Sequence, residues 1–166
     1  MQTQKRRRLL TGGLISLMVG PILTCPPLAT AAPARRDTPL TPARDLQAEA
    51  RQAARTGFPL VLMFSRKDCP YCITVRRDYL APLTRIPRFE HVLLRQIDQD
   101  RDTPLQDFQG RPTTHAAFAA REKIRLVPVV GFYGPEGQHL SEAIIGARLP
   151  DFYQSYLESA LLQGRQ

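Results

Sequence analysis

Apolar residues follow two kinds of spacing along this chain. Continuous apolar runs of about 4–8 residues are typical of strands buried in a sheet, whereas apolar residues repeating with the helical period are typical of helices that pack one face against a core. The first pattern predicts a strand over residues 60–65, and three further strands are expected over 91–97, 127–133 and 140–145. The second predicts four helices, over residues 42–56, 70–80, 114–122 and 150–162. The polar stretch 98–112 is expected to be a loop.

The order of these elements predicts a mixed sheet. Strands separated by helices need crossover connections and are therefore parallel. The sequence Gly134-Pro135-Glu136-Gly137, in contrast, is a turn of the kind that joins antiparallel neighbours. We therefore expect an α/β fold with three layers, α/β/α, in which a mixed four-stranded sheet is flanked by helices on both faces.

Each helix is expected to turn an apolar face inward. Met63 is predicted to be buried in its strand, and Phe118 to point inward from the helix over 114–122. In and just after the helix over 70–80, the inward residues are expected to be Ile73, Tyr79, Leu80 and Leu83. In the last helix they are expected to be Phe152, Tyr156, Leu157, Ala160 and Leu161.

The start of the chain resembles an export signal. The basic cluster Lys5-Arg6-Arg7-Arg8 precedes an apolar run from residue 9 to 23, and Ala29-Thr30-Ala31 offers a signal-peptidase site. The run is shorter than the roughly 20 residues that span a bilayer, so cleavage is favoured over a membrane anchor. We expect a signal peptide over 1–31, a flexible lead over 32–41 and one domain over 42–166. The choice between the general secretory and twin-arginine routes stays open.

Removal of the signal changes the charge of the chain. The full sequence carries 23 basic and 15 acidic residues, a net charge of +8. Four basic residues and no acidic ones lie in 1–31, so 19 basic and 15 acidic residues remain, a net charge of +4. The remaining arginines are scattered among aspartates without a long basic block. This pattern argues against a nucleic-acid-binding surface.

The cysteines narrow the chemistry. Cys25 falls in the predicted signal, which leaves Cys69 and Cys72. A disulfide between them closes too small a loop to stabilise a fold by much. A zinc site needs four ligands, and the histidines lack paired metal spacing. Redox use of Cys69 and Cys72 is therefore favoured, with a partial metal site or a regulatory switch as the alternatives.

The position of the two cysteines suits dithiol chemistry. They follow the strand 60–65 and open the helix that begins at Pro70, where unpaired N–H groups stabilise a thiolate. Arg66 and Lys67 would add to this effect and Asp68 would oppose it, although all three also fit a simple solvated loop.

Cys69-Pro70-Tyr71-Cys72, together with Val127-Pro128 about 55 residues later, Gly146 in the closing hairpin and a final helix, resembles the thioredoxin-fold superfamily. The resemblance covers roughly residues 45–162 and is greatest to small exported thioredoxin-like proteins of bacteria. It implies that Cys69 is the nucleophile and Cys72 the resolving thiol. It further implies that Val127 and a cis Pro128 bind the substrate, next to Pro70 and Tyr71.

Two residues depart from thioredoxin itself. Thioredoxin has a tryptophan before the first cysteine, where this chain has Asp68, and the chain contains no tryptophan. Thioredoxin also buries an aspartate in the strand before the motif, where this chain has Met63. Without that aspartate, deprotonation of Cys72 needs water, a backbone-linked path or the substrate.

The resemblance implies a periplasmic thiol-disulfide oxidoreductase, with reduction of substrates favoured over oxidation. Its expected partners are proteins that bear disulfides or thiols and a membrane electron donor. No cofactor, metal or nucleic acid is expected, and the protein is expected to be a monomer. Two alternatives stay open: a non-catalytic thioredoxin-like binding module with a redox-sensitive cysteine pair, and a carrier of Cu(I), which would need nearby Met or His ligands.

Overall fold

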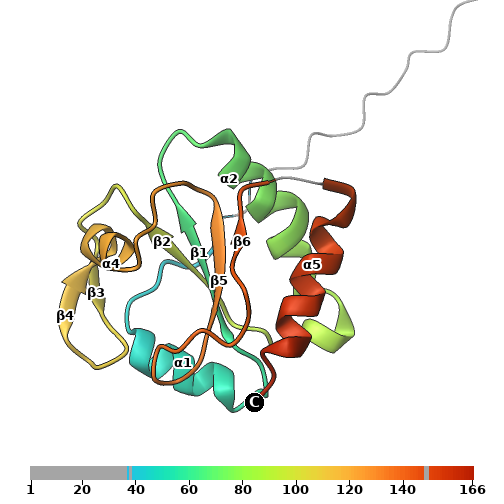
Figure 1. The fold of residues 1–166 in the computed structure, drawn as a ribbon, viewed down its shortest axis with the longest axis horizontal. Coiled ribbons are helices and arrows are strands. Elements are labelled where there is room, and N and C mark those ends of the chain that lie inside the picture. The colour runs from blue at the N-terminus through green and yellow to red at the C-terminus, as the bar shows by residue number, and fades with distance from the viewer. Residues whose placement is uncertain (1–36, 38, 148–149) are drawn as a thin grey trace, which may run out of the picture. The chain divides into compact units, whose positions relative to one another are not determined.

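The fold is described by a computed structural model over residues 37, 39–147 and 150–166 (Figure 1). The predicted signal peptide, residues 1–31, and part of the predicted lead lie outside these residues. Among the described helices, none combines the length and the apolar character that crossing a membrane requires.

The described chain contains strands and helices in alternation, followed by a final hairpin and helix. The strands are β1 (Leu60–Ser65), β2 (Leu94–Asp98), β3 (Pro104–Gln106), β4 (Pro112–Thr114), β5 (Val129–Tyr133) and β6 (Ile144–Ile145). The helices are α1 (Leu46–Ala54), α2 (Pro70–Thr74), α3 (Ala81–Leu83), α4 (His115–Arg121) and α5 (Pro150–Gln163), with the π-helix η1 (Val75–Leu80) and the 3₁₀-helix η2 (Pro87–Phe89).

Four of the strands form a central mixed sheet in the order β2–β1–β5–β6. β1 is parallel to β2, and β5 is antiparallel to both β1 and β6. Helices α1 and α4 pack on one face of this sheet, and the helical segment α2–η1–α3 packs with α5 on the other (Figure 1). The predicted three-layer α/β/α fold is therefore confirmed.

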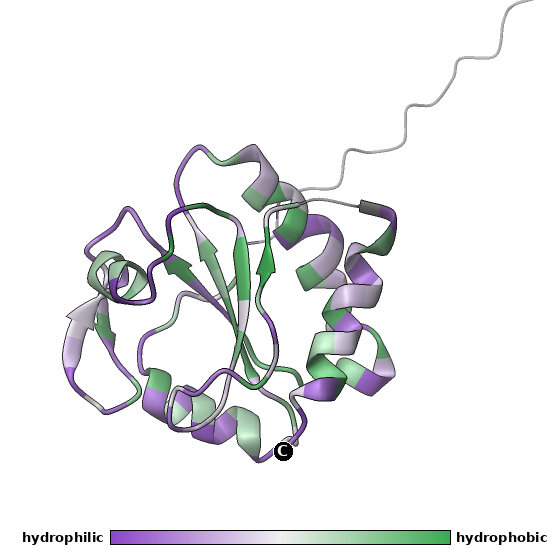
Figure 2. Cartoon of the chain, viewed as in Figure 1, coloured by the Kyte–Doolittle hydropathy of each residue, from purple (hydrophilic) through white to green (hydrophobic). Residues whose placement is uncertain are grey.

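The side chains of β1 alternate between two apolar clusters. Val61 and Met63 pack with the helices α2 and α5, whereas Leu62 and Phe64 pack with α1 and α4. All of β1 is buried, as predicted for a continuous apolar run, and apolar colour marks the central strands in Figure 2. The ring of Phe64 stacks on Phe118 with 6.1 Å between centroids, which confirms the inward orientation of Phe118.

The prediction of a loop over 98–112 was partly wrong. β3 and β4 pair as a small antiparallel hairpin, in a sheet separate from the central one. Each strand is only three residues long and begins with a proline, which cannot donate a ladder hydrogen bond. Such short strands leave no readable alternation in the sequence.

The first helix was predicted too long. Asp45 is extended and accepts a hydrogen bond from the backbone N–H of Ala48 at 2.9 Å, so α1 begins only at Leu46. The preceding residues lie along β2 instead: the backbone N–H of Ala43 donates to the Gln96 carbonyl, and that of Gln96 donates to the Thr41 carbonyl. The segment thus extends the edge of the central sheet.

The helix after the cysteines is not a regular α-helix over 70–80. It changes to a π-helix at Val75, and the backbone N–H of Ala81 donates to the carbonyl of Arg76. Pro82 has no N–H to donate to the carbonyl four residues earlier, and we attribute the wider turn to this missing bond. Val75, Leu80 and Leu83 are buried and Tyr79 partly so, but Ile73 is exposed, contrary to the prediction.

The strand and helix ends near the C-terminus also differ from the predictions. β5 begins at Val129 and not at residue 127, and β6 is reduced to Ile144–Ile145. In α5, Leu157, Ala160 and Leu161 are buried as predicted, whereas Phe152 and Tyr156 are exposed. Tyr153 is the buried aromatic residue of this helix; its ring lies 4.5 Å from that of Tyr79.

One ion pair ties the start of the described chain to the helix that follows the cysteines. Arg76, which is buried, donates from Nε and Nη2 to the two carboxylate oxygens of Asp37, at 2.8 and 2.6 Å. Its Nη1 donates to Oε1 of Gln96 in β2. The hydrogen bond from Arg76 lowers the pKa of Asp37 below its ordinary value of 3.8, against the opposing effect of burial.

We predict that Asp37→Asn lowers the free energy of unfolding by about 0.5 kcal/mol at pH 7, a small value because the aspartate is partly exposed. A lowered carboxyl pKa gives stability that is present above about pH 4 and is lost as the pH falls through the lowered pKa. The difference between variant and wild type should therefore vanish in urea unfolding at about pH 2. Glu136→Gln, which removes an exposed carboxylate, is the control; an equal loss in both variants would contradict the assignment.

Candidate active site

The two cysteines lie where β1 leads into α2. A short loop follows Ser65, and Cys69 is the residue that caps the N-terminus of α2. Cys69 and Cys72 form a disulfide, with their Cα atoms 5.2 Å apart. The structure is thus that of the oxidised pair, in the place that the sequence predicted between a strand and a helix.

The loop before Cys69 is held by the segment after β2. The backbone N–H of Gln99 donates to the carbonyl of Ser65 at 2.8 Å, and the backbone N–H of Lys67 donates to the carboxylate of Asp100 at 3.0 Å. Asp68 adopts a left-handed backbone conformation with φ of 57°, which aspartate tolerates better than most residues. Sequence reasoning assigned Asp100 to a solvated loop and missed this contact.

The sulfur of Cys69 receives a backbone hydrogen bond from its own helix. The N–H of Cys72 donates to Sγ of Cys69 over 3.2 Å. The same N–H also donates to the backbone carbonyl of Cys69 at 3.0 Å, so its bond to the sulfur is shared, and the partial positive charge of the helix N-terminus favours a negative group. Cys69 is also the more accessible thiol, with 6% of its surface exposed against 1% for Cys72.

A groove lies beside Tyr71, the residue that directly precedes Cys72. Its lining includes Tyr71, Val127, Pro128, Gly146 and Ala147, and its volume is about 290 Å³. The Val127–Pro128 peptide bond is cis, as predicted. The carbonyl of Pro128 accepts a hydrogen bond from the backbone N–H of Gly146 at 2.8 Å. Tyr71, Val127 and Pro128 thus come together in one groove, whereas Pro70 is exposed at the start of α2.

The inner side of the disulfide is apolar. Cys72 packs in the same cluster as Met63, Val75 and Tyr153, and Met63 is fully buried, as predicted. The buried acid of the described core, Asp107, belongs to the β3–β4 region, where its carboxylate accepts hydrogen bonds from Arg111 and Arg121. Met63, at the position where thioredoxin carries its aspartate, thus belongs to the same buried apolar cluster as Cys72.

The described histidines are engaged elsewhere. The buried His115 accepts the backbone N–H of Asp98 at Nδ1, and its Nε2 lies 2.9 Å from the carbonyl of Ala43. His91 and His139 lie within 3.5 Å of glutamate carboxylates. Over the described residues, no cluster of three or more His, Cys, Asp or Glu side chains is placed to hold a metal ion.

A scan against family models matches residues 46–161 to the family described as "Thioredoxin-like domain". The chain belongs to the thioredoxin-like family. The matched residues include β1, the cysteine pair, the cis-proline and most of α5, so the match spans the whole candidate site. A search of curated proteins gives no match.

Solved thioredoxin structures share the fold of this thioredoxin-like chain. The oxidised mitochondrial thioredoxin 3 of Saccharomyces cerevisiae is 19% identical, with a TM-score of 0.50 over 74% of this chain and 93% of that one. A thioredoxin h of poplar is 17% identical, with a TM-score of 0.48 over 70% and 95%. The periplasmic thioredoxin SoxS of Paracoccus pantotrophus is 17% identical, with a TM-score of 0.45 over 64% and 98%.

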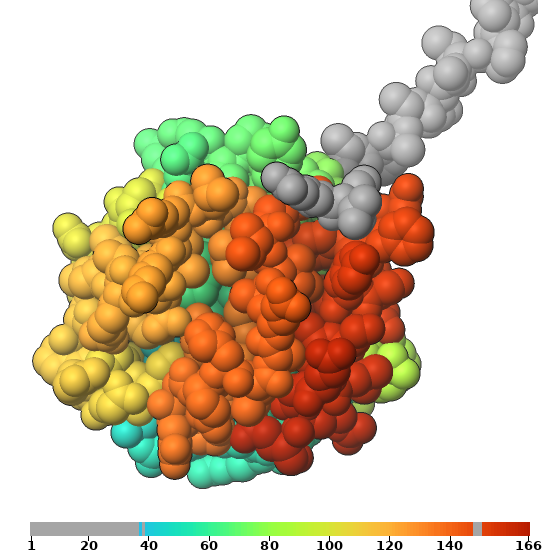
Figure 3. All heavy atoms as spheres, in the orientation of Figure 1, coloured from blue at the N-terminus to red at the C-terminus, as the bar shows by residue number. Residues whose placement is uncertain are grey.

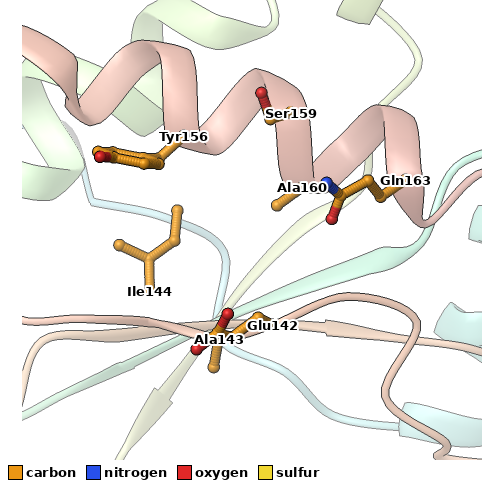
Figure 4. A pocket seen from close by; sticks show the side chains of 7 residues that line it. All are labelled: Glu142, Ala143, Ile144, Tyr156, Ser159, Ala160 and Gln163. Carbon is orange, nitrogen blue, oxygen red and sulfur yellow. The ribbon is translucent and has the colours of Figure 1, made fainter.

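A larger cavity lies between β6 and α5, away from the cysteines. Its volume is about 330 Å³, and the side chains of Ile144, Tyr156 and Ala160 border it (Figure 4). Neither cysteine lines this cavity. Neither cysteine is among the residues that line the groove at Pro128 either, but Tyr71, which stands between them in the sequence, lines that groove.

We predict that, after reduction, iodoacetamide modifies Cys69 at least tenfold faster than Cys72 at pH 7, because Cys69 is more accessible and accepts the N–H of Cys72. The tenfold figure corresponds to roughly 1.4 kcal/mol of selective stabilisation. Mass spectrometry of timed samples measures the two rates. In urea-unfolded protein the rates should converge, and a faster reaction at Cys72 in the folded protein would rule out the assignment.

Proposed function

We propose that this protein is an exported thiol-disulfide oxidoreductase that exchanges disulfides with protein substrates, with Cys69 as nucleophile and Cys72 as resolving thiol. The observation that carries the proposal is the place of the Cys69 sulfur. It accepts a hydrogen bond at a helix N-terminus, and Tyr71, two residues further along the chain, lines a groove with Val127 and cis Pro128. Membership in the thioredoxin-like family supports the same chemistry.

In the reducing direction, the thiolate of Cys69 attacks one sulfur of a substrate disulfide. A bond forms between Cys69 and that sulfur, and the second substrate sulfur leaves as a thiolate that takes up a proton. Cys72 then attacks Cys69 in the mixed disulfide. This step releases the other substrate sulfur as a thiol and leaves the Cys69–Cys72 disulfide. Two electrons pass from the cysteine pair to the substrate, and the reverse sequence oxidises a dithiol.

Substrate binding uses the groove at Pro128. Proline lacks an N–H, so the residue before it offers its backbone groups to an extended substrate segment. Val127 is in that position, outside β5 and only partly buried. Tyr71, whose side chain is 68% exposed, provides an apolar surface on the other side of the groove. Pro70 starts the helix in a position that needs no N–H donor.

The second step needs Cys72 to lose its proton. Its apolar surroundings, with Met63 where thioredoxin has an aspartate, disfavour a free thiolate. We infer that the leaving substrate thiolate, which lies within reach of the pair in the mixed disulfide, takes this proton directly or through water. The resolving step is then tied to the presence of substrate.

Reduction is the direction that we propose, with electrons supplied by a membrane donor. The periplasm is oxidising, so a reductase there has to be recharged from the membrane, whereas an oxidase needs only an unstable disulfide. Export is supported by the basic and apolar residues and the Ala29-Thr30-Ala31 site at the start of the sequence. The alternative function is a non-catalytic binding module in which the cysteine pair acts as a redox-sensitive clasp.

We predict that Cys69→Ser abolishes the reduction of insulin by dithiothreitol-charged protein, because the attacking sulfur is lost. Cys72→Ser should instead accumulate a mixed disulfide with the substrate, since the first step proceeds and the second does not. Turbidity of the insulin B chain and non-reducing gels measure the two outcomes. Full activity in Cys69→Ser would refute the proposal, and Ser155→Ala, a substitution at an exposed position on α5, is the control.

The reduction potential separates the proposed directions. For a reductase we expect the Cys69–Cys72 pair to equilibrate with glutathione near about −270 mV, and a value near about −120 mV would indicate an oxidase. The binding module predicts slow exchange and a pH dependence of Cys69 alkylation like that of free cysteine. Equilibration against defined glutathione ratios, followed by alkylation and mass spectrometry, measures the potential.

A further inference from the structure

A second groove lies next to the groove at Pro128, and Leu126 and Ile145 are among the residues that line it. Its volume is about 310 Å³. The face of the molecule in Figure 3 is hollowed between the segment that follows α4 and the segment around β6. We call it the Leu126 groove, and its apolar lining consists of Ile124, Leu126, Val129, Tyr133, Ala143 and Ile145.

Leu126 and Ile145 line the Leu126 groove, and both are large apolar residues with most of their surface exposed. Leu126 has 71% and Ile145 has 62% of its surface exposed. The floor, in contrast, is closed, because Val129 and Tyr133 are buried in the core of the sheet. Exposed apolar side chains that border a concave apolar surface are typical of a protein-binding site.

Two segments of the chain each contribute neighbouring residues to the Leu126 groove and to the groove at Pro128. Leu126 directly precedes Val127 and Pro128, and Ile145 directly precedes Gly146, so each of the two adjoins residues that line the groove at Pro128. The two grooves are therefore lined by adjacent residues of the same two segments, and a polypeptide segment bound at Pro128 would lie next to the Leu126 groove.

The rim of the Leu126 groove is positively charged. Lys123 and Arg125 are exposed, and neither makes an ion pair with a described residue. The one carboxylate of the rim, that of Glu122, accepts the hydroxyl of Tyr133 at 3.0 Å and lies 3.5 Å from Nε2 of His139. Its charge is therefore held inward, and the outer rim attracts an acidic partner.

We propose that the Leu126 groove selects the substrate segment: it binds an apolar side chain of a protein substrate, flanked by acidic residues, close in sequence to the cysteine that Cys69 attacks. This inference rests on the proposed function, since the segment is placed by its disulfide. The apolar side chain would contact Leu126 and Ile145, and the acidic residues would face Lys123 and Arg125.

The test uses two peptides, each with one cysteine joined in a disulfide to 5-thio-2-nitrobenzoate. One peptide carries Leu and Glu on both sides of its cysteine, and the other carries Ser and Lys. Attack by pre-reduced protein transfers the peptide sulfur to Cys69 and releases the yellow thiolate, whose rate stopped-flow absorbance measures. For the wild type we expect the Leu-Glu peptide to react about tenfold faster, as burial of part of a leucine side chain would give.

Variants of the groove should change the ratio of the two rates. Leu126→Ser is expected to lower the ratio by removing the apolar contact, and Lys123→Glu with Arg125→Glu is expected to lower it by removing the attraction for acidic residues. Leu162→Ser and Arg85→Glu are the matched controls, because both residues are exposed and neither lines the groove; they should keep the wild-type ratio. A wild-type ratio of one, or equal changes in the controls, would overturn the inference.

A binding measurement keeps the two proposals separate. If neither peptide releases thiolate, the proposed redox function fails, and the groove is then judged by fluorescence anisotropy with cysteine-free peptides and the double variant Cys69→Ser, Cys72→Ser. Tighter binding of the Leu-Glu peptide that Leu126→Ser abolishes would support the groove, and equal binding of both peptides would overturn it. A dimer in sedimentation velocity that Leu126→Ser abolishes would also overturn it, since a second copy would then cover the groove.

Discussion

The pairing of β1 with β5 is the constraint on which the site depends. The two strands are antiparallel, with Phe64 opposite Val129, so the end of β1 lies beside the start of β5. The chain leaves β1 toward Cys69 and enters β5 from Pro128, and both points lie at the same end of these two central strands. Two segments some 60 residues apart are thereby brought together. The register leaves little freedom, because a slip by one residue would turn the buried side chains of β1 to the wrong faces.

The surroundings of the disulfide differ sharply between its two sides. Toward solvent, Cys69 lies at a helix N-terminus beside exposed Arg66 and Lys67, in a setting that favours charge. Toward the core, Cys72 belongs to an apolar cluster that includes Met63. The two sulfurs of one disulfide are therefore unequal in access and in electrostatics.

The parts of the fold with strong local signals were predictable from sequence. The apolar run of β1, the cysteines opening α2, and Val127-Pro128 before β5 each identified their elements, and the family match covers these same positions. The β3–β4 hairpin escaped prediction because its strands are too short to show alternation, and η1 escaped because the effect of Pro82 appears several residues earlier in the chain. Helical spacing also placed Ile73, Phe152 and Tyr156 inward, although apolar character alone does not fix which face of a helix is covered.

The ion pair of Asp37 with Arg76 bears on where the folding unit begins. The family match starts at residue 46, at the first residue of α1, whereas Arg76 finds its carboxylate partner well before that point. The segment between them adds backbone hydrogen bonds to β2 and a contact to His115. A version of this protein trimmed to the family boundary would leave a nearly buried guanidinium without its counter-ion and an uncovered sheet edge. The folded unit of this chain therefore begins before residue 46, where the family match starts.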